Sequence, residues 1–364
     1  MNKRARAMVN YLISIVIALL LAFAIIGALL LWQGVDPVET FLALFQGAFI
    51  GKSNLGASLL LATPLILGGL GIALSFRCGI FNIGGEGQLY LGAFAATWLG
   101  VNLAGLPFWL HIPICFLGSM IFGGLWALIP GYLKISKGYN ETVTSVLLNY
   151  VGVYFVNYAL SSFFKAPGAL NHQSPKIQAS AMLSKIMSGS ELNTSFLMAL
   201  LIVALFFLIF YKTDVGFKLR AVGQNAEASR TSGIHTRKYL LLAIIVSGAL
   251  SGLAGSVQVM GYQHLMVQNF SPNTGYDIIA VALMGNLHPI GVLIAGIFLG
   301  ALRSGASVMQ IMMGVPVTIL YIIQGVIILS ILGFSRANID FIGLAGGRFR
   351  KKESQSMSRG PIRK

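Results

Sequence analysis

Long apolar runs separated by short polar segments extend along the chain from residue 8 to residue 334. The runs are continuous and rich in Leu, Ile, Ala and Gly, and several reach the roughly 20 residues that a helix needs to cross a bilayer. A transmembrane barrel would instead show short segments of alternating polarity. The pattern therefore predicts an all-α polytopic membrane protein with about ten transmembrane helices. The predicted spans are residues 8–32, 55–75, 80–99, 107–131, 142–163, 194–212, 239–260, 275–287, 290–311 and 316–334.

Two of the longer segments between the predicted spans are predicted to lie outside the cell. Residues 36–54 favour a short amphipathic helix at the outer surface, and residues 164–193 form the main external loop. The first segment contains GAFIGKS (residues 47–53), which resembles a nucleotide-binding loop but has three residues between its first glycine and the Gly-Lys pair, where the motif requires four. We therefore predict no ATP site here, and any ATP that the protein uses would bind to another chain.

Composition and charge agree with this pattern. Hydrophobic residues make up 56% of the chain and charged residues only 10%, whereas soluble domains carry roughly a quarter charged residues. The net charge of +15 gathers at the N-terminus, at residues 134–137, at residues 212–238 and in the tail from Arg336. Because basic loops stay in the cytoplasm, both termini are predicted to be cytoplasmic, and nucleic-acid binding is disfavoured. We expect a transmembrane domain over residues 1–335 and a basic cytoplasmic tail over residues 336–364.

Residues that could support enzyme chemistry are scattered. Cys78 and Cys115 lie in or beside apolar segments without metal-type spacing, and we interpret them as unpaired small hydrophobic residues. The five histidines contain no pair at i and i+4, and no nucleophile–base constellation is evident. The sequence thus predicts no catalytic site, no metal site and no bound cofactor.

Residues 76–92, FRCGIFNIGGEGQLYLG, interrupt an apolar run with charges and glycines. Residues 82–86 (Asn-Ile-Gly-Gly-Glu) and 273–277 (Asn-Thr-Gly-Tyr-Asp) each place a glycine two residues and an acid four residues after an asparagine, before an apolar run. Such matches are typical of repeat folds with broken helices in corresponding positions of two halves. Irregular backbone is tolerated at that depth only where it is buried in protein or faces water. We therefore predict two pseudo-repeated halves whose breaks line a translocation path.

Three of the ten acidic residues lie within or against predicted spans, namely Glu86, Glu141 and Asp277. A buried ionisable side chain is costly in a bilayer and marks a substrate or ion pathway by default. For Glu86 we favour such a role over a structural pair with Arg77, and for Asp277 both interpretations stay open. Glu141 is expected at the cytoplasmic boundary near Lys137, in a structural role.

The longest polar segment on the predicted cytoplasmic side is residues 211–239. Its centre, GQNAEASRTSGI from Gly223 to Ile234, favours a short helix with Gly223 and Gly233 at its ends. A short polar helix between two spans has no membrane face to bury. It is therefore either a solvated turn or a segment that docks into a partner.

This polar segment, together with FRCGIFNIGGEGQLYLGAFAA, NETVTSVLLNY and GYDIIAVALMGNLHPIGVLIAGIFLGAL, resembles a known family. These segments are similar to the permease subunit of bacterial ATP-binding-cassette importers, in the branched-chain amino acid and simple-sugar permease superfamily. Within it, the chain resembles the nucleoside (guanosine-type) branch, because ribose permeases carry a different sequence at FNIGGEGQ. The resemblance extends from about residue 55 to residue 334.

The resemblance implies an importer subunit of the bacterial plasma membrane that has no enzymatic activity of its own. A separate ATPase subunit would hydrolyse ATP, a second and non-identical permease would complete the membrane part, and an extracellular lipoprotein would deliver the substrate. The short cytoplasmic helix would dock into the ATPase and couple its closure to alternating access. The coupling residues implied are Gly223, Gln224, Asn225, Ala226, Glu227, Ala228, Ser229, Arg230 and Gly233.

A nucleoside has a flat base and ribose hydroxyls, so its path needs aromatic faces and hydrogen-bonding groups. Residues of these types lie beside the two breaks and in the span 142–163. The candidate path residues are Phe81, Asn82, Glu86, Gln88, Tyr90, Asn149, Tyr150, Asn273, Tyr276 and Asp277. Two alternatives stay open: ribose-like simple sugars as substrate, or an ion-coupled secondary transporter in which Glu86 and Asp277 bind protons or sodium.

Overall fold

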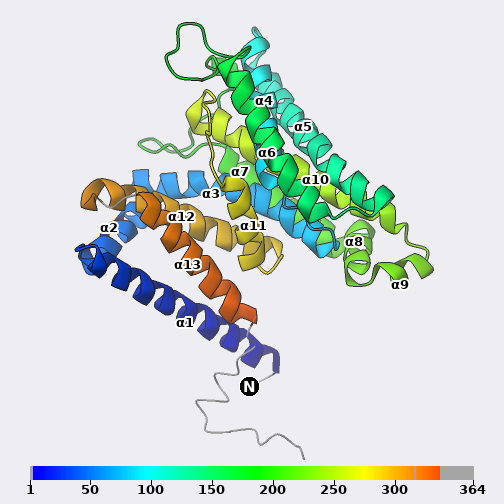
Figure 1. The fold of residues 1–364 in the computed structure, drawn as a ribbon, viewed down its shortest axis with the longest axis horizontal. Helices are drawn as coiled ribbons and strands as arrows, with labels where there is room; N and C mark the ends of the chain where they lie inside the picture. The colour runs from blue at the N-terminus through cyan, green and yellow to red at the C-terminus, as the bar shows by residue number, and fades with distance from the viewer. Residues whose placement is uncertain (1–2, 315–316, 337–364) are drawn as a thin grey trace, which may run out of the picture. The chain divides into compact units, whose positions relative to one another are not determined.

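The computed structural model describes residues 3–314 and 317–336, and these residues form helices joined by short connections and one long loop (Figure 1). The described part of the chain contains thirteen α-helices and no β-strand, so the all-α prediction is confirmed. The first seven α-helices are α1 Lys3–Trp32, α2 Pro37–Phe49, α3 Lys52–Arg77, α4 Gly85–Asn102, α5 Phe108–Lys137, α6 Glu141–Ser161 and α7 Ser195–Lys212. The others are α8 Asp214–Gln224, α9 Ala226–Thr231, α10 Thr236–Gln258, α11 Thr274–Met284, α12 Pro289–Met313 and α13 Val317–Arg336. A 3-10 helix, η1 Ala179–Ala181, and a π-helix, η2 Val259–Gln263, complete the set.

The chain divides into two compact units. One unit contains residues 1–34 and 322–364, and the other contains residues 35–321. In the first unit, α1 buries an apolar side chain at every fourth position from Ala18 to Leu30, which is the spacing of one helix face. Residues 337–364 of the predicted cytoplasmic tail lie outside the described residues. All candidate path and coupling residues belong to the second unit.

Six helices in the described ranges are long and apolar enough to cross a membrane, which confirms a multi-pass membrane protein. These are Lys52–Arg77, Phe108–Lys137, Glu141–Ser161, Ser195–Lys212, Thr236–Gln263 and Pro289–Met313. Shorter apolar helical stretches occur at Val16–Trp32, Thr274–Met284 and Tyr321–Ser330. The number of ten crossings stays a prediction. The span predicted over residues 80–99 differs in its start, because the backbone turns irregular after Arg77 and α4 begins only at Gly85.

Helix α2 matches the amphipathic helix predicted over residues 36–54. The Asp36 carboxylate accepts hydrogen bonds from the amides of Val38 and Glu39, which caps the helix start. One face of α2 is buried, including Thr40 and Leu44, and α2 packs against α12 within the second unit. The helix itself is confirmed, and its location at the outer membrane surface stays a prediction.

Helix α10 is central to the second unit and packs against α3, α4 and α5. Its glycines make this possible, because a Cβ at Gly252 would overlap the backbone of α5 at Ser119 and one at Gly255 would overlap the backbone of α4 at Leu89. Gly92 on α4 faces Gly252 in the same way. Small residues at these positions let the helix backbones approach closely.

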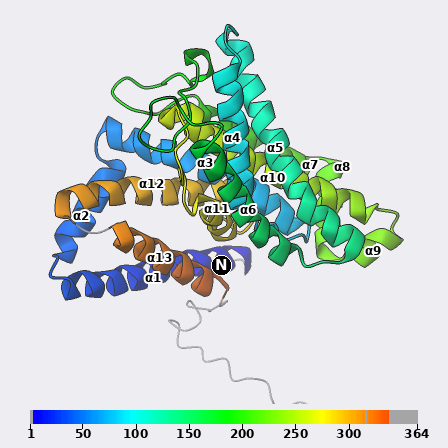
Figure 2. The same cartoon turned by 45° about the horizontal axis from the view of Figure 1, so that its top comes forward.

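The packing of the second unit repeats itself between two sets of three helices. After α3 the helical structure is interrupted by an irregular segment, the first break, and resumes as α4 and α5. After α10 it is interrupted by the second break and resumes as α11 and α12 (Figures 1 and 2). Helix α3 packs on α11 and α12, while α10 packs on α4 and α5. In addition, α3 contacts α10 and α4 contacts α11. Each long helix therefore packs against the continuation of the other, which confirms two halves with broken helices.

The long loop over residues 164–193 packs against η2 and against the second break, which comprises residues 264–273. Within it, the amides of Ser174, Ile177 and Leu183 donate to the carbonyls of Met266, His264 and Met260, at 2.8, 3.0 and 2.9 Å. The side chains of Ser174, Ile177 and Leu183 are themselves buried. The loop thus supplies partners to backbone groups that the break leaves without helical hydrogen bonds.

Candidate functional site

The first break, residues 78–84, is closed by side-chain amides. Asn82 and Gln88 form a reciprocal pair. The Asn82 Nδ2 donates to the Gln88 Oε1, and the Gln88 Nε2 donates to the Asn82 Oδ1, both at 2.9 Å. Asn82 also donates to the Ser247 hydroxyl on α10 at 2.9 Å and accepts from the amide of Gly84 at 3.0 Å. Both side chains are buried. The pair therefore holds the broken backbone against α4 and α10, which is a structural use of these two candidate path residues.

Asn149 fixes the same break from α6. Its Oδ1 accepts from the amide of Gly87 at 2.9 Å, and its Nδ2 donates to the carbonyl of Ile83 at 2.9 Å. The same Nδ2 lies 3.4 Å from the Tyr276 hydroxyl on α11. Gly87 lies close to α6, because a Cβ there would lie 3.0 Å from the Cα of Asn149. One amide thus connects α6, the first break and α11.

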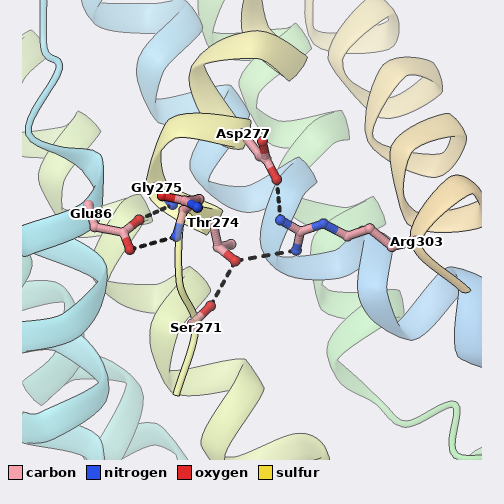
Figure 3. Close-up of polar contacts among 7 residues, drawn as sticks. Glu86, Ser271, Thr274, Gly275, Asp277 and Arg303 are labelled. Atoms are coloured by element: carbon pink, nitrogen blue, oxygen red, sulfur yellow. Dashed lines mark hydrogen bonds and ion pairs between the residues drawn. The ribbon is translucent and has the colours of Figure 1, made fainter. Parts of the chain in front are cut away.

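Glu86 joins the two breaks (Figure 3). Its carboxylate oxygens accept from the backbone amides of Asn273, at 3.0 Å, and Gly275, at 2.5 Å. These amides belong to the start of α11, where backbone donors have no helical partner and a negative charge is favourable. The alternative pairing of Glu86 with Arg77 is wrong, because the Arg77 guanidinium instead donates to the carbonyl of Asn286 at 3.4 Å.

Asp277, in the first turn of α11, forms an ion pair with Arg303 on α12. The guanidinium also donates to the Thr274 hydroxyl at 3.3 Å, and the Ser271 hydroxyl donates to the same oxygen at 2.8 Å. The Asp277 and Arg303 side chains are 15% and 18% exposed. Figure 3 shows Glu86 and Arg303 reaching the start of α11 from opposite sides.

Arg303 was not among the residues selected from the sequence. The available signal was an arginine inside the apolar run of residues 290–311, since cations at this depth are as costly as acids. The ionisable path candidates taken from the sequence are all acidic, so they do not include the partner of Asp277.

The remaining path candidates differ in exposure. Tyr90 is buried, and its ring lies 4.8 Å from that of Phe270 in the second break. Phe81 is 51% exposed and its ring contacts that of Phe76, while Tyr276 is 36% exposed. Asn273 is exposed and adopts a left-handed conformation with φ of 63°. Tyr150 is exposed on α6.

Apart from Tyr150 and the ion-paired Asp277, the candidates fall into two groups. Asn82, Glu86, Gln88, Tyr90 and Asn149 are buried and tie the breaks together. Phe81, Asn273 and Tyr276 are exposed beside the breaks.

Glu141 lies at the first position of α6 and forms an ion pair with Lys134, at 2.9 Å. Asn140 caps this helix by accepting from the amides of Thr142 and Val143. The predicted neighbour Lys137 lies one turn further along α5 and is not the partner.

The candidate coupling segment contains two short helices, where the sequence predicted one. Helix α8 covers residues 214–224, and α9 follows as Ala226–Thr231. Asn225 separates them and caps α9, because its Oδ1 accepts from the amides of Glu227 and Ala228 at 3.1 and 2.9 Å. In α9, Ser229 is buried and the other five residues are exposed.

The two glycines of this segment have different roles. Gly233 follows α9 with φ of 83°, a conformation that glycine adopts without strain, so it ends the helix as predicted. Gly223 does not mark a helix end. It lies inside α8, and a Cβ there would overlap the carbonyl oxygen of Arg77 at the start of the first break. Helix α8 is therefore in direct backbone contact with the broken segment.

Helix α8 is also anchored to the end of α7. The Arg220 guanidinium donates to the carbonyl of Phe210 and lies 5.1 Å from the centre of the Tyr211 ring. Leu219 and Val222 are buried in the same cluster as Phe210. These contacts fix α8, whereas α9 projects from it with little packing of its own.

No group of three or more His, Cys, Asp or Glu residues that could hold a metal ion occurs within residues 3–314 and 317–336. Cys78 and Cys115 are both buried and free.

Comparison with known proteins adds to this geometry. Residues 54–332 match the family described as the permease component of the branched-chain amino acid transport system. The chain is 34% identical to the guanosine ABC transporter permease protein NupP of Bacillus subtilis, over 94% of this chain and 98% of that protein. It is 33% identical to the nucleoside ABC transporter permease protein NupB of Lactococcus lactis, over 91% and 92% of the two chains. It is also 33% identical to the glucose ABC transporter permease protein TsgB13 of Haloferax volcanii, over 87% and 86%.

Proposed function

Because the chain belongs to the family of branched-chain amino acid transport system permease components, we propose that it is the membrane-spanning subunit of an ATP-binding-cassette importer for nucleosides. The observation that carries the proposal is similarity along nearly the whole chain to permeases named for guanosine and nucleoside transport. In this role the chain hydrolyses no ATP, and a separate ATPase subunit supplies the energy.

The exposed residues beside the two breaks are the proposed contacts for substrate. Phe81 and Tyr276 offer aromatic faces to a base, and Asn273 offers an amide to ribose hydroxyls. The buried residues serve the path indirectly, because Asn82 and Asn149 hold irregular backbone that has no helical hydrogen bonds. Substrate affinity comes mainly from an extracellular binding lipoprotein, so the permease needs only weak contacts along the path.

Helix α9 is the proposed docking element for the ATPase. It is polar, almost fully exposed and connected to the first break through α8, whose Gly223 contacts the backbone of Arg77. Movement of α9 would therefore reach the first break through Asn225, which joins α9 to α8, and through the contact of Gly223 with Arg77. Docking of α9 to the ATPase requires that residues 212–238 lie in the cytoplasm. We propose this orientation, with both termini also cytoplasmic, in the plasma membrane of a bacterium.

A second permease, homologous but not identical, completes the proposed membrane assembly. Co-expression of two differently tagged copies of this chain tests this point. Recovery of one tag with the other would contradict the non-identical pair. Recovery of this chain only together with a homologous permease would support it.

Simple sugars are the second candidate substrate, because the relative from Haloferax volcanii is named for glucose and matches almost as well. Uptake of radiolabelled guanosine, with and without the gene, separates the two candidates. We expect uptake to be lost in the deletion strain and to be competed by adenosine or uridine but not by ribose or glucose. Unchanged guanosine uptake, or competition by the sugars alone, would overturn the nucleoside assignment and leave the importer architecture in place.

Ion-coupled transport is disfavoured by the partners of the two acids. Glu86 uses both carboxylate oxygens on backbone amides, and Asp277 is paired with Arg303. Both carboxylates therefore already have partners within the protein.

The coupling proposal is tested by reversing an exposed charge on α9. Arg230→Glu should abolish assembly with the ATPase or substrate-stimulated ATP hydrolysis in reconstituted proteoliposomes. Lys52→Glu is the matched control, because it reverses an exposed charge at the start of α3, on the predicted outer side. Equal activity of both variants would contradict docking through α9.

A further inference from the structure

The ion pair of Arg303 and Asp277 lies where the two halves of the second unit meet (Figure 3). Burying two charges costs desolvation free energy that their attraction does not always recover, so such a pair is weak support for stability. Its position is more informative than its strength. The partners lie on α12 and on the first turn of α11, the helix that follows the second break.

Arg303 contacts two residues of this turn. Thr274 and Asp277 are three positions apart, so they share one face of α11. Glu86 contacts the same turn from α4, through the amides of Asn273 and Gly275. The first turn of α11 is therefore held between a guanidinium from its own half and a carboxylate from the other half.

The charges of this cluster make Arg303 necessary for the arrangement. Two carboxylates, Glu86 and Asp277, approach one helical turn, and the guanidinium is the cation that pairs with the second. Without Arg303 the Asp277 charge would be uncompensated in a region of low dielectric constant, close to the negative charge of Glu86. Repulsion between the carboxylates would then favour separation of the turn from Glu86.

We propose that Arg303 is a positioning residue of the transport path. It neutralises Asp277 and holds the first turn of α11, so that Glu86 stays bound to the amides of Asn273 and Gly275 and Tyr276 stays beside Asn149. The role concerns the geometry of the path and involves no contact between Arg303 and substrate. A transport assay of this role rests on the proposed function, whereas a structural measurement of it does not.

The structural readout is hydrogen exchange of the full-length chain in lipid nanodiscs without substrate. Arg303→Gln should raise amide exchange by at least about tenfold in peptides covering residues 270–280 and leave those covering α8 and α9 unchanged. Arg303→Gln combined with Asp277→Asn should restore most of the protection, because removing both charges leaves none uncompensated. Arg303→Lys should be intermediate, since an ammonium can pair with Asp277 without reaching Thr274 as well.

Lys185→Gln is the matched control, because it breaks an ion pair with Glu191 whose two side chains are 55% and 58% exposed. Exchange that rises equally along the whole chain in Arg303→Gln, or a double variant as unprotected as the single one, would overturn the proposal.

The transport readout is the concentration dependence of guanosine uptake by the assembled transporter. Arg303→Gln should lower the maximal rate by at least about tenfold and leave the half-saturating concentration within about twofold, and the double variant should recover within about threefold. A raised half-saturating concentration with an unchanged maximal rate would assign Arg303 to substrate binding and overturn the positioning role. If the wild type takes up no nucleoside, the proposed function fails, and hydrogen exchange still decides the role of Arg303.

Discussion

The two breaks in the second unit both consist of irregular backbone, but they differ in the groups that stabilise it. The first, residues 78–84, is closed by residues near it in sequence, chiefly the reciprocal amides of Asn82 and Gln88. The second, residues 264–273, contains three non-glycine residues in the left-handed conformation, His264, Asn269 and Asn273. Its backbone groups find partners in the long loop and in Glu86 of the first half.

This difference shows that corresponding segments of a repeat fold can be stabilised by different hydrogen-bond partners, local in one half and distant in sequence in the other. The first break carries most of its own hydrogen-bond partners, so we expect it to keep its conformation when the second is disturbed. The second break depends on groups from α4, α12 and the long loop, so it is the more easily altered of the two. A path that must change shape during alternating access would therefore move first at α11.

Gly275→Ala should have the largest effect, because it removes the contact between the two breaks. A Cβ at Gly275 would overlap backbone atoms of Glu86, which cannot rotate away as a side chain could. We expect a loss of about 3 kcal/mol or more in the free energy of unfolding, seen as loss of monodisperse protein in detergent. Gly333→Ala is the control, since a Cβ there meets nothing within 4 Å. Normal yield of Gly275→Ala would refute the close approach of α4 and α11.

Glu86→Gln should have the next largest effect, and it should act on the second break. A glutamine has one acceptor oxygen, so its amide nitrogen would face a backbone N–H of Asn273 or Gly275. The expected cost is about 2–3 kcal/mol, in the range for hydrogen bonds to charged groups. Hydrogen exchange should rise over residues 273–277 and stay unchanged over residues 78–84. The opposite distribution would mean that Glu86 belongs to the first break.

Asn82→Ala should affect the first break alone. It removes the partner of Gln88 and the contact with Ser247, and it leaves the amide of Gly84 without an acceptor. We expect a cost of about 1–2 kcal/mol, measured by unfolding in mixed micelles, with exchange rising only around residues 82–88. Asn102→Ala is the control, because this exposed amide bonds only to the carbonyl of Trp98 on its own helix. A rise in exchange over residues 270–280 would contradict the independence of the first break.

His264→Gly should have the smallest effect. The left-handed conformation costs a residue with a side chain about 1–2 kcal/mol, whereas glycine loses about 0.5–1 kcal/mol in backbone entropy. These effects nearly cancel, so the free energy of unfolding should change by less than about 1 kcal/mol. A large loss of stability would show that the imidazole itself holds the second break.

Much of the fold follows from local sequence patterns. Continuous apolar runs determine the helices and their membrane character, because a bilayer accepts only segments that satisfy their own backbone hydrogen bonds. Glycine, asparagine and acid at matching spacings located both breaks, since such residues permit irregular backbone. The amphipathic α2 and the end of α9 at Gly233 also follow from local preferences, whereas the cap at Asn225 and the division of the coupling segment into α8 and α9 were not predicted.

Only the tertiary structure decided which of these residues touch one another. The sequence placed Glu86 and Asp277 in corresponding positions and could not show that one binds amides of the opposite half while the other pairs with Arg303. Periodicity reports a helix face, whereas partners 187 to 189 residues apart are fixed by how helices cross. Local composition therefore determined the helices and breaks of this protein, and long-range packing decided the roles of their polar residues, because a hydrogen bond depends on three-dimensional proximity that sequence spacing does not encode.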